Sequence, residues 1–314
     1  MKIVLLEDLG VSQDALENKI RPLKERGIEV VSFPRTSEVK KLQEEVQGAD
    51  AIILANMPLP AEALEKADQL KFIDVAFTGV DHIPLALARE KGMTVSNASG
   101  YATEAVAELA LAFMIDLERE VRAMDAATRA GKNKGSFRGR LLKDKTVGIV
   151  GAGEIGREVA RLCKAFGART LAYQRHPVND AAIDEQCDLD TLLKEADIVS
   201  LHVPLTESTR HLIGEAELAK MKPTAFLINT ARGPVVDSAA LARALEAGQI
   251  AGAALDVFDS ESPLAKESPI LQAPNTLFTP HIGYDTVESM EKRLEIVFAN
   301  LDAWLEGHPK NQIL

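Results

Sequence analysis

Short runs of aliphatic and β-branched residues alternate with helical hydrophobic patterns along almost all of the 314 residues. In the first third, four such runs predict strands, at residues 2–6, 28–31, 51–54 and 72–76. A second series predicts six more strands, at residues 146–150, 170–173, 198–201, 226–228, 251–255 and 276–278. This alternation is typical of βαβ units, which form parallel sheets with helices on both faces. The sequence therefore predicts an α/β protein with two doubly wound parallel-sheet domains.

Residues 103–124, between the two series, carry apolar side chains spaced by three or four positions, from Val106 to Met124. The spacing predicts one long helix that connects the domains, with Thr103 as its N-cap. The helix has more apolar surface than a connection needs, so we expect it to help form a two-fold homodimer. The alternative is a helix buried wholly within one subunit.

The charge balance and the cysteine count exclude several classes of partner. The chain has 36 basic and 47 acidic residues, whereas nucleic acids and anionic membranes need a basic face. No apolar run approaches the roughly 20 residues of a membrane span. The two cysteines, Cys163 and Cys187, form neither a CxxC pair nor a His/Cys cluster. We therefore expect no metal site, and we expect the protein to lie in the reducing cytoplasm. A small molecule is the expected partner.

A glycine turn follows the strand predicted at residues 146–150. Its sequence is Gly151-Ala-Gly153-Glu-Ile-Gly156, and a helical pattern follows directly. Gly151 permits a tight turn, Gly153 lets the backbone approach a pyrophosphate, and Gly156 lets helix and strand pack closely. The helix N-terminus then faces the phosphates. Strand, turn and helix together predict a dinucleotide-binding turn.

The position that selects between NAD and NADP departs from the usual pattern. The second strand of a dinucleotide fold commonly ends in Asp or Glu, which holds the ribose 2′-hydroxyl. Here the position holds Gln174, followed by Arg175. The missing carboxylate removes repulsion of a 2′-phosphate, and the guanidinium can bind one. The cofactor is therefore expected to be NAD(P) with a slight preference for NADP, unless Arg175 is simply a solvated loop charge.

Three later segments each follow a predicted strand: INTARG to Arg232, ALDVFDSE to Glu261, and TPHIG around His281. These strings, together with LHVPLT and GVDHI, occur in the order found in D-isomer-specific 2-hydroxyacid dehydrogenases, and the chain resembles that family over nearly its whole length. The resemblance implies a cofactor domain at residues 99–282, inserted into a flavodoxin-like substrate domain at residues 1–98 and 283–314. It also implies an active site in the cleft between them and a homodimer.

The chemistry of the Arg, Glu and His side chains agrees with that resemblance. Arg232 can bind the carboxylate of a 2-oxo acid through two charge-assisted hydrogen bonds. Hydride arriving at the carbonyl carbon leaves negative charge on oxygen, to which His281 can donate a proton. Glu261 beside the imidazole favours its charged form and fixes its orientation. Singly, each residue also fits a structural role at a strand end or in a loop.

The resemblance assigns further residues to the cofactor and to the substrate. Asp256 would hold the nicotinamide carboxamide, although a buried cap at the strand end is equally compatible. The remaining positions assigned to the cofactor are Thr103, Glu154, Ile155, His202, Pro204, Thr209, Thr230 and Ala231. A structural role for His202 is as plausible as a place in the cofactor cleft. The backbone of Thr78, Gly79 and Val80 would receive the substrate carboxylate.

Two departures from the family pattern surround the predicted site. The family commonly has Glu-Pro where this chain has Glu261-Ser262-Pro263, and Tyr284 follows TPHIG in place of a small residue. We expect NAD(P)-dependent reduction of a small unphosphorylated 2-oxo acid, such as glyoxylate, hydroxypyruvate or pyruvate, to a D-2-hydroxy acid. The alternative is a non-enzymatic NAD(H)-sensing protein like the corepressors of the same family.

Overall fold

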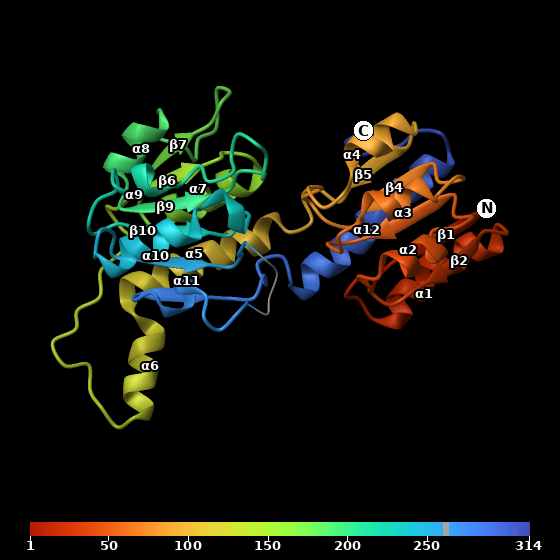
Figure 1. Ribbon diagram of the computed structural model, residues 1–314. Coiled ribbons are helices and arrows are strands. Elements are labelled where there is room, and N and C mark those ends of the chain that lie inside the picture. The colour runs from red at the N-terminus through yellow and green to blue at the C-terminus, as the bar shows by residue number, and fades with distance from the viewer. Residues whose placement is uncertain (260–263) are drawn as a thin grey trace. The chain divides into compact units, whose positions relative to one another are not determined.

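The computed structural model describes residues 1–259 and 264–314 (Figure 1). The chain divides into two compact units. The outer unit comprises Met1–Ala102 and Asp285–Leu314, and the inner unit comprises Thr103–Tyr284. The inner unit is therefore inserted into the outer one along the chain, and both are α/β units.

The outer unit has a five-stranded parallel sheet in the order β2-β1-β3-β4-β5, the flavodoxin-like order. Its strands are β1 (Lys2–Leu5), β2 (Glu29–Ser32), β3 (Ala51–Leu54), β4 (Phe72–Val75) and β5 (Thr94–Asn97). Its helices are α1 (Gln13–Glu25), α2 (Val39–Glu45), α3 (Ala61–Glu65), α4 (Leu85–Glu90) and α12 (Val287–Leu305). Every residue of β3 and β4 is buried, which explains the continuous apolar run of β3, whereas β4 buries the carboxyl of Asp74 among apolar side chains.

The outer unit contains one strand more than the four that the sequence predicted. The missed strand, β5, has the sequence TVSN, in which Val95 is the one aliphatic residue. The C-terminal segment supports it, because Ser96 forms an antiparallel bridge with Gln312 and its hydroxyl donates to the Lys310 carbonyl at 2.7 Å. Helix α12 lies against β4, where Trp304 stacks on Phe72 with ring centroids 4.9 Å apart.

The inner unit has a seven-stranded parallel sheet in the order β12-β11-β10-β9-β6-β7-β8. Its strands are β6 (Thr146–Val150), β7 (Arg169–Tyr173), β8 (Glu185–Gln186), β9 (Ile198–Leu201), β10 (Phe226–Asn229), β11 (Gly252–Leu255) and β12 (Thr276–Phe278). Without β12, this is the 3-2-1-4-5-6 order of the Rossmann fold, which confirms the predicted fold class. The sequence missed β8 because its two residues are polar and exposed.

Seven α-helices of the inner unit are α5 (Thr103–Arg119), α6 (Val121–Arg129), α7 (Glu154–Ala165), α8 (Leu189–Glu195), α9 (Glu215–Leu218), α10 (Ser238–Glu246) and α11 (Pro269–Gln272). Asp237 caps α10 by accepting a hydrogen bond from the Ala240 amide. Val106, Phe113 and Met114 of α5 are buried in this unit. Helix α5 therefore belongs to the inner core.

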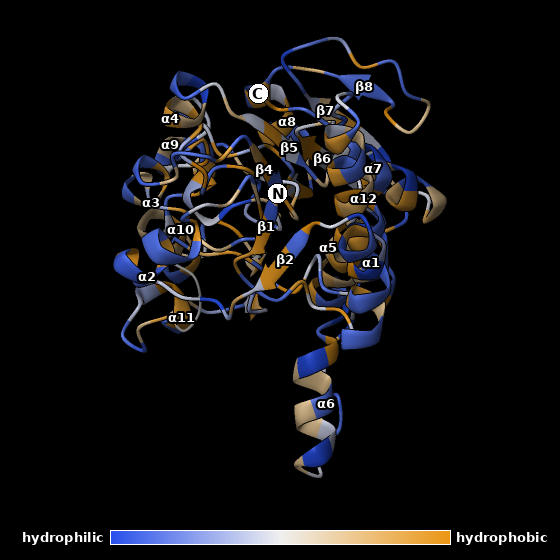
Figure 2. Ribbon diagram, turned by 90° about the vertical axis from the view of Figure 1, so that its right-hand side faces the viewer, coloured by the Kyte–Doolittle hydropathy of each residue, from blue (hydrophilic) through white to orange (hydrophobic). Residues whose placement is uncertain are grey.

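The prediction of one helix over residues 103–124 was wrong. Glu120 adopts a left-handed conformation with φ of 46°, which ends α5 and starts α6 in a new direction. The Asp116 carboxylate accepts the Arg122 amide at 3.0 Å across this break. Helix α6 has no buried residue and projects from the inner unit (Figure 1), with hydrophilic and hydrophobic residues interspersed along it (Figure 2).

Two features are absent from residues 1–259 and 264–314. Within these residues, no helix is both long enough and apolar enough to cross a bilayer. The same part of the chain contains no group of three or more His, Cys, Asp or Glu side chains placed to hold a metal ion.

Candidate active site

The glycine turn after β6 requires glycine at two positions. Gly151 has φ of +98°, and a Cβ there would lie 2.8 Å from the His202 carbonyl carbon. A Cβ on Gly156 would lie 2.1 Å from the Gly151 oxygen. Both distances are shorter than contact allows, so the turn and the start of α7 can pack only with glycine. A Cβ on Gly153 would meet no heavy atom within 4 Å, so the space beside this residue is open.

Helix α7 begins immediately after this open position. Gly153 is its N-cap and has no side chain to accept a hydrogen bond from the first turn. The sequence-predicted residues Glu154 and Ile155 are the first two residues of the helix, and Glu154 is exposed. The first N–H groups of a helix carry partial positive charge and bind anions well. The uncapped helix start and the open position beside it leave room for an anionic group.

The Gln174 side chain bends back onto the glycine turn. Its Oε1 accepts a hydrogen bond from the Ala152 amide at 3.1 Å. Because a backbone N–H can only donate, this contact fixes which end of the side-chain amide faces the turn, and the Nε2 donors point elsewhere. Arg175 and His176 follow and are exposed.

The loop after β9 holds three of the predicted cofactor residues. Burial of the His202 ring lowers its pKa to about 3, so the ring is neutral, and its Nε2 lies 2.8 Å from the Ser200 hydroxyl. The Thr209 hydroxyl donates to the Pro204 carbonyl at 2.6 Å and accepts the Thr206 amide at 2.8 Å. Thr209 therefore closes this loop, while Pro204 is exposed on it.

The loop after β10 positions Arg232. Asn229, which is 1% exposed, accepts the Ala231 amide at 3.0 Å and donates to the Arg232 carbonyl at 2.9 Å. The Thr230 hydroxyl is buried and has no hydrogen-bond partner within the described residues. A Cβ on Gly233 would lie 1.9 Å from the Phe258 carbonyl carbon, so this loop packs directly against the segment that follows β11.

Asp256, at the end of β11, holds the turn that carries His281. Its backbone oxygen accepts the His281 amide at 2.8 Å. Its carboxylate accepts the Thr279 hydroxyl at 2.5 Å, the Ile282 amide at 2.8 Å and the Gly283 amide at 2.8 Å. Burial raises the pKa of this carboxyl, against the lowering effect of these hydrogen bonds. The buried-cap role considered for Asp256 is therefore observed.

His281 itself has φ of 60°, a conformation that residues other than glycine rarely adopt. Its ring packs edge-on against Tyr284, with centroids 5.1 Å apart at 84°. Strained conformations persist where the surroundings fix them, and they concentrate at functional sites. The Asp256 hydrogen bonds supply that constraint here.

Sheet order brings these segments together. Arg232, Asp256 and His281 follow the neighbouring strands β10, β11 and β12, at the edge where doubly wound sheets bind ligands. Glu261 lies outside the described residues. Thr103 is the first residue of α5 rather than its N-cap.

The segment with Thr78, Gly79 and Val80 follows β4 in the outer unit. The buried Asn97 donates to the Thr78 carbonyl at 2.7 Å. The neighbouring loop after β3 is held by Glu7, whose Oε1 accepts the amides of Ala55 and Met57 at 2.7 and 2.9 Å.

Two residues of the site architecture were not predicted. Asn229 orients the Arg232 loop, and Thr279 holds Asp256. Both lie in the strings INTARG and TPHIG, so their place was visible but their role was not. A buried amide at the end of an apolar strand is the signal available for Asn229.

The model of the D-isomer specific 2-hydroxyacid dehydrogenase NAD binding domain matches residues 111–283, more than half of the chain. The chain belongs to this family. It is 41% identical over 299 residues to a glyoxylate reductase of Thermococcus litoralis, covering 91% of this chain and 90% of that protein.

Two solved structures resemble the chain over nearly its whole length. An acyclic imino acid reductase in complex with NADPH and D-Arg has a TM-score of 0.92 and 29% identity, with full coverage of both chains. The D-lactate dehydrogenase of Aquifex aeolicus, complexed with NAD and lactic acid, has a TM-score of 0.86 and 31% identity, covering 98% of this chain and 96% of that one.

Proposed function

We propose that this chain catalyses the NAD(P)-dependent reduction of a small 2-oxo acid to a D-2-hydroxy acid, and the reverse oxidation. The observation that carries the proposal is the hydrogen-bond network of Asp256. This network fixes the turn with His281 after β12, and Arg232 follows β10, two strands away in the same sheet. The glyoxylate reductase relative supports a catalytic rather than a corepressor-like role. The test is absorbance loss of NADH and NADPH with purified protein and a panel of 2-oxo acids.

The inner unit fits a nicotinamide dinucleotide. The turn from Gly151 to Gly156 would hold its pyrophosphate, since Gly153 leaves space and the first turn of α7 has no side-chain cap. The buried Thr230 hydroxyl lacks a partner within the described residues, which a bound ligand would supply. When bound, the reduced cofactor supplies hydride to the carbonyl carbon of the substrate.

The catalytic side chains then have separate roles. Arg232 binds the substrate carboxylate, and the His281 imidazolium donates a proton to the carbonyl oxygen. Glu261, which lies outside the described residues, is the residue that the sequence assigns to orienting that imidazole. The Asp256 carboxylate accepts three hydrogen bonds from its own chain, two at Oδ1 and one at Oδ2. Because a carboxylate accepts about four hydrogen bonds, Oδ2 can also accept one from the nicotinamide carboxamide.

We further propose that NADP is accepted at least as well as NAD. The Gln174 Oε1 is held by Ala152, so the side chain offers donors rather than a carboxylate near the ribose, beside the exposed Arg175. Gln174→Asp should shift the kcat/KM ratio toward NADH through carboxylate–phosphate repulsion. A wild-type protein that uses NADH far better than NADPH would contradict this preference.

The substrate is proposed to be unphosphorylated. The loop at residues 55–60 has no basic residue of its own, but Arg35 donates to the Asn56 Oδ1 at 2.6 Å, so a cation does lie beside it. Its charge is balanced, because the same Nη1 atom lies 3.0 Å from the buried Glu7 carboxylate. Comparison of kcat/KM for hydroxypyruvate and phosphohydroxypyruvate decides: a tenfold preference for the phosphorylated compound would overturn the proposal.

We also propose that the chain forms a homodimer in the cytoplasm. The apolar residues of α5 are largely used inside the inner unit, so the surface available to a second subunit is on α6, where Val121 is 52% exposed. Light scattering should give twice the chain mass of 34.0 kDa. A monomer at micromolar concentration would contradict the dimer.

A further inference from the structure

The turn that follows β7 is fixed by one side chain from β8. Gln186 donates from Nε2 to the carbonyls of Gln174 and His176, at 2.9 and 3.1 Å. Its Oε1 accepts the Val178 amide at 2.9 Å. One carboxamide thus uses both amide hydrogens and its oxygen on three backbone groups of residues 174–178. Glutamate lacks the donors, and asparagine is one methylene shorter.

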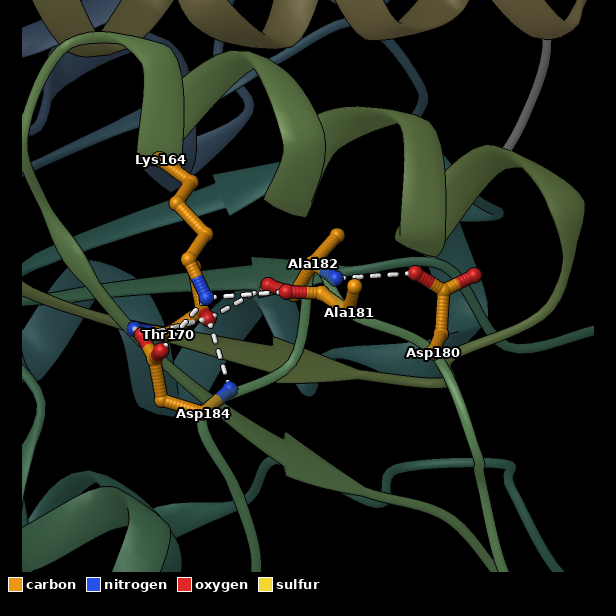
Figure 3. Close-up of polar contacts among 6 residues, drawn as sticks. All are labelled: Lys164, Thr170, Asp180, Ala181, Ala182 and Asp184. Atoms are coloured by element: carbon orange, nitrogen blue, oxygen red, sulfur yellow. Dashed lines mark hydrogen bonds and ion pairs between the residues drawn. The ribbon is translucent and has the colours of Figure 1, made fainter.

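The far end of the same loop is held independently (Figure 3). The buried Thr170 hydroxyl donates to the Ala182 carbonyl at 2.6 Å, and Asp184 accepts the Thr170 amide at 2.9 Å. Lys164 reaches down from α7 to the Asp184 carboxylate at 2.6 Å and the Ala181 carbonyl at 2.8 Å. With residues 180–184 anchored in this way, the conformation of residues 174–178 depends on Gln186.

These residues are the ones that meet the adenosine ribose in a dinucleotide fold. Gln174 connects the turn to the phosphate-binding backbone through Ala152, and Arg175 leaves from the same stretch of chain. We propose that Gln186 is a positioning residue that sets the relative affinity for 2′-phosphorylated and unphosphorylated adenosine ribose. This inference rests on the proposed use of a nicotinamide dinucleotide.

The contacts made by Gln186 are solvent-exposed, so the expected effect is on cofactor selectivity rather than on folding. Loss of the three bonds leaves the chain folded through the Thr170 anchor, but the backbone that carries Gln174 and Arg175 loses the hydrogen bonds that hold it. A 2′-phosphate accepts several hydrogen bonds from such donors, whereas a 2′-hydroxyl accepts few. Affinity for the phosphorylated ribose should therefore fall more.

The experiment measures the binding of 2′,5′-ADP and 5′-AMP by isothermal titration calorimetry to the intact protein. Gln186→Met preserves side-chain length and removes all three bonds. We expect the affinity ratio of 2′,5′-ADP to 5′-AMP to fall about fivefold or more. Glu185→Met, at the neighbouring residue of β8, is the control, because it breaks an ion pair with Arg169 of β7 without touching the turn. The control should leave the ratio unchanged.

A double-mutant cycle separates positioning from general structural damage. If Gln186 acts through the two donors, Gln186→Met should no longer change the ratio when Gln174→Met and Arg175→Ala are already present. An unchanged ratio in the single variant, or equal loss for both nucleotides, would overturn the inference while leaving the proposed reductase intact. Failure of the wild type to bind either nucleotide would overturn the proposed function and this inference with it.

Discussion

The carboxyl edges of the two sheets are built by different means. In the inner unit, loops approach one another closely enough to require glycine at Gly151, Gly156 and Gly233, in addition to the side-chain hydrogen bonds of Asn229 and Asp256. In the outer unit, loops are held by buried polar side chains, chiefly Glu7 and Asn97. The first construction fixes the backbone that would receive a cofactor, and the second fixes loops through side chains that substitution can change. The difference is consistent with a constant cofactor and a variable substrate.

The largest expected effect on stability comes from adding a side chain where the loop after β10 packs against the segment after β11. Gly233→Ala places a Cβ 1.9 Å from the Phe258 carbonyl, so backbone must move, and we expect a loss of about 3 kcal/mol in the free energy of unfolding. Gly153→Ala is the matched variant, since its Cβ meets nothing within 4 Å. It should fold normally but bind NADH or NADPH at least about tenfold more weakly. Urea unfolding and cofactor fluorescence measure the two effects; equal stability of both variants would break the comparison.

A smaller effect is expected at the outer edge. Glu7→Ala leaves the Ala55 and Met57 amides without their acceptor, at a cost of roughly 1–3 kcal/mol for a buried unpaired group. Glu7→Gln keeps an acceptor oxygen and removes the charge beside Arg35. The alanine variant should lose stability and raise KM for the oxo acid, and the glutamine variant should retain most of its stability. If the two variants unfold alike, the acceptor role assigned to Glu7 is incorrect.

The smallest effect concerns pH. Burial raises the pKa of Asp74 well above its ordinary value, against the hydrogen bond from Asn300, so the folded chain keeps a proton that the unfolded chain releases. Stability from this group is therefore lost as the pH rises above about 4, the unfolded value, toward the folded pKa. Asp74→Asn has no such proton and should gain stability relative to wild type between about pH 5 and about pH 7. The exposed Asp68→Asn should show no gain, and a parallel pH profile for Asp74→Asn would refute the assignment.

The sequence predicted the features that depend on apolar runs, glycine and motif order. These include the fold class, the buried strands and the segments carrying Gly151, Arg232 and His281. It missed β5 and β8, because short polar strands are defined by their neighbours rather than by their own residues. It joined α5 to α6 because hydrophobic spacing continues through Glu120, whose left-handed backbone ends α5 without a local sequence signal.

The side-chain hydrogen bonds of the candidate site also could not be predicted from the sequence. Nothing in the order of residues places Gln186 on the turn after β7, or Arg35 on Asn56, since each contact depends on which strands become neighbours. The three bonds of the Asp256 carboxylate likewise require the pairing of β11 with β12.

The most direct test of the proposed reaction is turnover by His281→Asn, since asparagine tolerates the left-handed backbone at this position but cannot act as the acid. We predict a fall in kcat of about 10²–10⁴-fold for glyoxylate reduction, with the dissociation constant for the nicotinamide cofactor nearly unchanged. His308→Ala, an exposed histidine, should behave as wild type. Wild-type turnover by His281→Asn would contradict the central claim that this imidazole supplies the proton.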